Sequence, residues 1–149
     1  MNNTLIQQVS ERYAAGTIQM DPRAREVSGV IKVITLLTRK PGMSREAFIE
    51  YYESNHRLIG EKYLGGYAVK YQRRYLAPVE ADVLNSDDLP FDVLMEIWFP
   101  DRATMDKAMA LLSTEEAQEE IVADEERVFD RALIRSYIVE EYESDMTTE

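Results

Sequence analysis

His56 is the only histidine in this chain of 149 residues, and it closes the segment Tyr51-Tyr-Glu-Ser-Asn-His56. Histidine is the side chain whose ordinary pKa lies nearest to neutral, so it is the natural carrier of a proton near pH 7. The sequence therefore offers one clear candidate for a general acid or base. The structural alternative is a histidine at the end of a helix, where its positive form interacts favourably with the helix dipole.

The spacing around His56 predicts which side chains accompany it. Phe48, Tyr52 and His56 recur at steps of four residues, and Ile59 follows nearly in line, so they share one inward face of a predicted helix. A tyrosine hydroxyl close to a histidine can orient a substrate carbonyl. Tyr52 and Tyr71 are therefore candidates for substrate binding, although such tyrosines are more often core or interface residues.

The segment 91–99 has the clearest strand pattern of the chain, and its alternation separates two faces. One face is wholly apolar and should lie under helices, whereas the other holds Glu96 beside Trp98. A carboxylate is costly within a hydrophobic core, so this second face should meet a cavity, an interface or water. Either Glu96 and Trp98 line the pocket as an acceptor and a flat wall for a ring, or they lie in a dimer seam. In the seam, Glu96 would pair with an arginine such as Arg73, Arg74 or Arg135.

Metal and cofactor chemistry has little support in the residues. Glu53 and His56 have the Glu-x-x-His spacing of carboxylate-bridged di-iron sites, but those sites need two copies and this chain has one histidine. A haem with His56 as its proximal ligand is chemically possible. There is no cysteine, and phosphate-binding glycine loops and dinucleotide fingerprints are missing. We expect no metal and no cofactor.

Composition narrows the class of partner and compartment. The net charge of −11 repels phosphate backbones and anionic lipid surfaces, so nucleic acid and membranes are not expected as partners. The sequence shows neither a signal-peptide pattern nor a long apolar run. We expect a cytoplasmic protein.

The order of predicted elements is strand, helix, two strands, two helices and strand. Strands are expected at 30–38, 67–76, 91–99 and 133–140. Ser44 should cap the helix that carries His56, with glycines at 60, 65 and 66 breaking it; further helices should follow Asp101 and Thr114. In the helix after Thr114, the expected buried positions are Ile121, Val122, Val128 and Phe129. This α+β pattern, βαββαβ, divides the chain into an N-terminal arm (1–29), a folded domain (30–142) and a polar tail (143–149).

Five segments together resemble the EthD-domain family. They are Ile31-Lys-Val-Ile, Arg39-Lys-Pro-Gly-Met-Ser-Arg-Glu-Ala-Phe, Tyr51-Tyr-Glu-Ser-Asn-His56, Glu96-Ile-Trp-Phe-Pro-Asp101 and Ala123-Asp-Glu-Glu. The resemblance implies a ferredoxin-like fold with an antiparallel sheet. It also implies a homodimer in which two sheets pack face to face as a dimeric α/β barrel, and it matches His56 to the histidine that ends the family's first helix.

The function that we expect combines this resemblance with the residues. His56 would act as the acid or base of a cofactor-free enzyme, a cyclase, isomerase or dehydratase-type lyase, on a hydrophobic cyclic or polyketide-like molecule. Tyr52, Tyr71, Arg73, Glu96 and Trp98 are the expected substrate-binding residues. Two alternatives stay open: a cofactor-free monooxygenase or accessory protein of an oxidoreductase or degradation system, and a non-catalytic protein that binds a hydrophobic metabolite.

Overall fold

The structure is a computed structural model that describes residues 29–79 and 90–147. Its strands are β1 (Ile31–Leu37), β2 (Lys70–Tyr75), β3 (Val93–Phe99) and β4 (Arg135–Ile138). Its helices are α2 (Arg45–Tyr51), the π-helical turn η1 (Tyr52–His56), α3 (Arg57–Leu64), α4 (Arg102–Leu112), α5 (Glu115–Val128) and the short 3₁₀ turn η3 (Arg131–Leu133). The expected order of strands and helices is confirmed.

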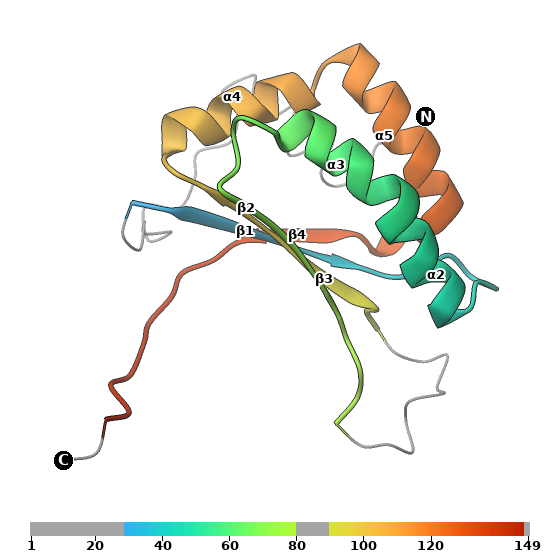
Figure 1. Cartoon of the computed structure of the whole chain (residues 1–149), viewed down its shortest axis with the longest axis horizontal. Coiled ribbons are helices and arrows are strands. Elements are labelled where there is room, and N and C mark those ends of the chain that lie inside the picture. Colours follow the sequence, from blue (N-terminus) through green and yellow to red (C-terminus); the bar gives the residue numbers. More distant parts are fainter. Residues whose placement is uncertain (1–28, 80–89, 148–149) are drawn as a thin grey trace.

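The described strands form one antiparallel sheet in the order β2-β3-β1-β4. The helices lie together on one face of this sheet, and within the described residues no element covers the other face (Figure 1). This is the α+β ferredoxin-like fold that the sequence predicts. Among the same residues, no helix is long and apolar enough to cross a membrane.

Local sequence explains where the helices begin. Ser44 accepts a hydrogen bond from the backbone N–H of Ala47, and Asp101 and Thr114 cap α4 and α5 in the same way. Each cap satisfies one of the first-turn amides that have no partner inside the helix. The three helix starts are where the sequence predicts them.

The helix that carries His56 is longer than the sequence predicts. It does not break at Gly60: after one π turn at Tyr52–His56 it continues as α3 to Leu64. His56 therefore lies in the middle of a continuous helical segment, and the alternative of a histidine at a helix end does not apply. A π turn adds one residue to a helical turn and is frequent at functional sites.

The core lies between the sheet and the helices in two clusters. One gathers around Phe48, Tyr52 and Phe129, and the other around Ile97 and Phe99. The apolar face predicted for β3 does lie under the helices. The prediction for α5 was incomplete: Val128 and Phe129 are buried, Ile121 and Val122 are half-buried, and Asp124 and Glu125 are buried beside them.

The predicted domain boundaries are not tested by these elements. The expected arm, residues 1–29, lies outside the described residues except for Gly29. The division into an arm, a folded domain and a tail stays a prediction.

Gly60 of α3 faces the ring of Tyr71 on β2. A Cβ atom at this position would lie 2.6 Å from the hydroxyl oxygen of Tyr71 and 2.7 Å from two of its ring carbons. We expect Gly60→Ala to lower the free energy of unfolding by about 1–3 kcal/mol because the ring must move. In a Tyr71→Ala background the same substitution should instead stabilise by about 0.5–1 kcal/mol, the ordinary advantage of alanine inside a helix.

Urea unfolding of the four proteins at one protein concentration measures this difference. An equal effect of Gly60→Ala in both backgrounds would show that the contact with Tyr71 does not explain the glycine.

Candidate functional site

A cavity of about 190 Å³ lies between the helical layer and the covered face of the sheet. Its floor comes from β1, β3 and β4, and its walls come from η1, α3, α4, α5 and β2. Most of the lining is aliphatic or methionine: Val33, Ile59, Leu64, Met95, Ile97, Met105, Met109, Leu112, Ile121 and Ile138. The groups in it that can carry a proton are His56, Glu125 and tyrosines that include Tyr52, Tyr63 and Tyr71. The cavity is thus apolar with a few polar groups, the usual composition of a small-molecule site.

Asp124 holds the imidazole ring of His56. The Nδ1 atom of His56 lies 2.8 Å from Oδ2 of Asp124. Asp124 is a residue of α5, and only 4% of its surface is exposed. Tyr51 donates its hydroxyl to Oδ1 of the same carboxylate at 2.5 Å. A carboxylate only accepts hydrogen bonds, so Nδ1 carries the proton in this contact and Nε2 is the nitrogen with a free lone pair.

Two aromatic rings pack against the imidazole of His56. Tyr52 and Phe129 meet it edge to face, with ring centroids 5.2 and 4.9 Å away. Burial among these rings lowers the pKa of His56 below its ordinary 6.5, and the hydrogen bond and charge of Asp124 oppose this shift without cancelling it. His56 is therefore mainly neutral at pH 7, with Nε2 able to accept a proton.

Tyr52 and Tyr71 meet inside the site, their hydroxyl oxygens 3.4 Å apart. Burial raises the pKa of both phenols above the ordinary value, so both hydroxyls keep their protons at neutral pH. They can donate hydrogen bonds to a ligand in the cavity, which both residues line.

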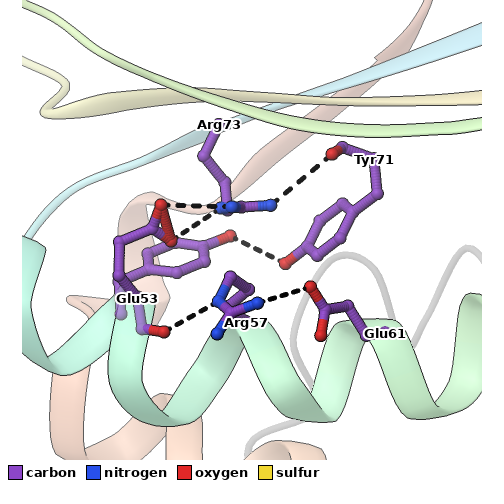
Figure 2. A network of polar contacts seen from close by, with 6 residues as sticks. Glu53, Arg57, Glu61, Tyr71 and Arg73 are labelled. Carbon is purple, nitrogen blue, oxygen red and sulfur yellow. Dashed lines mark hydrogen bonds and ion pairs between the residues drawn. The ribbon is translucent and has the colours of Figure 1, made fainter.

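Arg73 lies behind this pair of tyrosines. Figure 2 shows Arg73 of β2 reaching Glu53 of η1, through Nε to Oε2 at 2.8 Å and Nη2 to Oε1 at 3.1 Å. Its guanidinium also lies 4.8 Å from the ring centre of Tyr71. Arg73 does not line the cavity, where substrate binding was expected of it. Its ion pair with Glu53 instead connects β2 to the π turn, and its guanidinium packs on the ring of Tyr71.

The structure also separates Glu96 and Trp98 from His56. Neither lines the cavity, because both point to the opposite, uncovered face of the sheet. There Glu96 is buried and paired with Arg74, and the ammonium groups of Lys32 and Lys70 lie 4.1 and 4.0 Å from the Trp98 ring. The expectation of one pocket holding these residues together with His56 is not met. Glu96 is paired with one of the expected arginines, within the same chain; its place in a dimer seam stays a prediction.

Two residues of the candidate site, Asp124 and Glu125, were given no role in the sequence analysis, although both lie in the Ala123-Asp-Glu-Glu segment of the family resemblance. Asp124 orients His56, and Glu125 lines the cavity with 4% of its surface exposed. Helical periodicity could have identified them. Both acids fall on the face of α5 that carries Ile121 and Val128, where a helix ordinarily places apolar residues. Within the described part of the chain, no group of three or more histidine, aspartate or glutamate side chains is arranged to hold a metal ion.

The single histidine makes the electrostatics of the site directly measurable. NMR of the His56 ring over a pH series should give a pKa below 6.5 in the wild-type protein. In Asp124→Asn it should fall further, because the charge that raises it is removed. Glu119→Gln, an exposed substitution on the same helix, is the matched control and should leave the wild-type value. A wild-type pKa above 6.5 would contradict the burial argument.

Comparison with known proteins places the chain in a family. The model of the EthD domain matches residues 40–132. No protein with a curated description matches the sequence.

Among solved structures, similar folds occur at low sequence identity. An EthD-family protein from Bacillus halodurans is 21% identical, with a TM-score of 0.48 over 76% of this chain and 99% of that one. A dimeric protein of unknown function with a ferredoxin-like fold, from Bacteroides fragilis, is 11% identical, with a TM-score of 0.50 over 78% of this chain and 100% of that one. A protein from Arabidopsis thaliana is 14% identical, with a TM-score of 0.50 over 78% of this chain and 99% of that one. By its matched domain, the chain belongs to the EthD-domain family.

Proposed function

We propose that this protein is an enzyme that transfers a proton on a small, hydrophobic, cyclic or polyketide-like molecule, without a cofactor. The observation that carries the proposal is the buried His56–Asp124 pair at the wall of an apolar cavity. In this role Nε2 of His56 removes a proton from a carbon next to a carbonyl group. Cyclisation, isomerisation and dehydration can all begin with that step.

The arrangement around His56 supports a base. Asp124 fixes the Nδ1–H tautomer and stabilises the imidazolium that forms when Nε2 takes the proton. The lowered pKa of His56 keeps it neutral before the reaction. A base held in position within an apolar pocket is what such a step requires, so oxidising or reducing equipment is not needed.

The size and lining of the cavity support a ring-shaped substrate. Its volume of about 190 Å³ is comparable to an engineered apolar cavity of about 150 Å³ that binds benzene. The walls offer aliphatic and methionine side chains, which adapt to the shape of a ligand. The hydroxyls of Tyr52 and Tyr71 can orient its oxygen.

Hydrogen exchange tests this function without knowledge of the natural substrate. We expect the wild-type protein to accelerate exchange of the protons next to the carbonyl of a small cyclic ketone, such as indanone or cyclohexanone, for deuterium in D₂O. NMR follows the exchange. In His56→Gln the acceleration should fall by about 10²–10⁴-fold, the usual contribution of a general base, whereas Glu119→Gln should keep it.

Exchange by folded His56→Gln at the wild-type rate would contradict the proposal. Ketone binding without exchange in the wild-type protein would also contradict it, and would favour a binding protein. Oxygen consumption with the ketone would instead indicate a monooxygenase.

We further propose that the uncovered face of the sheet is the contact of a homodimer. That face carries half-buried apolar side chains on the two central strands, Ile34 and Leu36 of β1 and Leu94 and Trp98 of β3. Burying apolar surface favours association. The relative from Bacteroides fragilis is described as dimeric, which agrees with this assignment.

Solution mass tests the dimer. The wild-type protein should have twice the mass of the chain in light scattering, and Ile34→Asp should shift it to the monomer, because a charge would be buried in the contact. Leu58→Asp is the matched control: Leu58 is 49% exposed on α3, in the helical layer, and its substitution should leave the dimer. A monomeric wild-type protein would refute the proposal.

A further inference from the structure

Glu125 is a second buried group that can carry a proton in the cavity of His56. It lies on α5 directly after Asp124, and it lines the same cavity. Within the described residues, its Oε2 atom is buried without a hydrogen-bond partner. A buried carboxyl group without full hydrogen bonding is costly to maintain, so its position needs an explanation beyond packing.

The charges around Glu125 come from two elements. Arg131 of η3 places Nε 3.6 Å from Oε2 of Glu125, and it also pairs with Glu126 at 3.2 Å. Asp124 and Glu126 are its neighbours on α5. The other titratable groups lining the cavity are His56, Tyr52, Tyr63, Tyr71 and Tyr137.

These surroundings favour the protonated acid. Burial raises the pKa of Glu125 to about 7; Arg131 opposes the shift, and the negative charges of Asp124 and Glu126 add to it. The pKa of His56 is displaced in the opposite direction. When the environment of one pocket lowers the pKa of one group and raises that of another, the two commonly serve as a base and an acid.

We infer that Glu125 is the acid that works opposite His56: its carboxyl group protonates the carbonyl oxygen of the substrate while His56 removes a proton from the adjacent carbon. This inference rests on the proposed function. The C–H bond breaks, its proton goes to Nε2, and its electron pair forms the carbon–carbon double bond of an enol as the carbonyl oxygen takes the proton of Glu125. Return of both protons restores the imidazole and the carboxylic acid.

This pairing narrows the substrate class. The molecule should carry a neutral carbonyl group on or beside a ring, with an acidic C–H next to it. A substrate that is already a carboxylate at the reacting end would be repelled by the carboxylate of Asp124 beside His56.

A purely structural role for Glu125, as a partner of Arg131, gives different expectations. In that role the carboxyl group stays ionised through the neutral range, and replacing it by glutamine changes stability without changing the pH dependence of exchange. Both expectations can be measured.

The protonation state is tested on the intact protein by ¹³C NMR of the glutamate carboxyl groups over a pH series. We expect one carboxyl group to titrate near pH 7, to vanish in Glu125→Gln and to remain in Glu119→Gln. If every glutamate titrates in the ordinary range near pH 4.5, the inference is overturned, whether or not Glu125→Gln folds.

The catalytic role is tested by the exchange of indanone protons in D₂O. Glu125→Gln should slow exchange by about 10²-fold or more, with the binding of indanone retained. The wild-type rate should fall above about pH 7 as the acid ionises, and this fall should be missing in Glu125→Gln.

Three outcomes separate the two proposals. Loss of exchange in both His56→Gln and Glu125→Gln supports both. Loss in His56→Gln with an unchanged rate and pH profile in Glu125→Gln overturns the role of Glu125 and leaves the proposed function standing. No exchange by the wild-type protein overturns both.

Discussion

The hydrogen bond between His56 and Asp124 is the interaction on which the arrangement of the site depends. It joins the π turn to α5 across 68 residues of sequence. Asp124 is a buried acid whose carboxylate is hydrogen-bonded by His56 and by the hydroxyl of Tyr51, and Nη1 of the exposed Arg127 lies 3.9 Å from its Oδ1. A buried carboxylate with partners of this kind also fixes the orientation and tautomer of the ring it holds. The orientation and tautomer of the His56 ring are therefore set by a helix distant in sequence.

The sheet gives its two faces different properties. Toward the helices, Tyr71 and the aliphatic side chains of β1, β3 and β4 bound the cavity, and Arg73 ties β2 to the π turn through Glu53. On the uncovered face, Glu96 and Trp98 are engaged by cationic side chains of neighbouring strands.

Strand alternation and helix caps were sufficient to predict the elements and their order, because these signals are local. The long helix was predicted to stop at Gly60 because glycine inside a helix is usually unfavourable. The glycine instead makes room for Tyr71 of β2, a contact with another element that the local sequence does not show. Alternation likewise assigned Glu96 and Trp98 correctly to one face of β3, but it cannot tell which face has space left by packing. Asp124 and Glu125 were detectable as acids on an apolar helix face, whereas their partners depend on tertiary contacts.

The state of the His56 ring at neutral pH is the most direct test of the account. Two-dimensional ¹⁵N–¹H NMR of the single histidine distinguishes a protonated Nδ1, a protonated Nε2 and the doubly protonated ring. We predict a neutral ring with the proton on Nδ1, held by Asp124, and an unprotonated Nε2. An imidazolium at pH 7, or a neutral ring with its proton on Nε2, would contradict it, because His56 could then not act as the base.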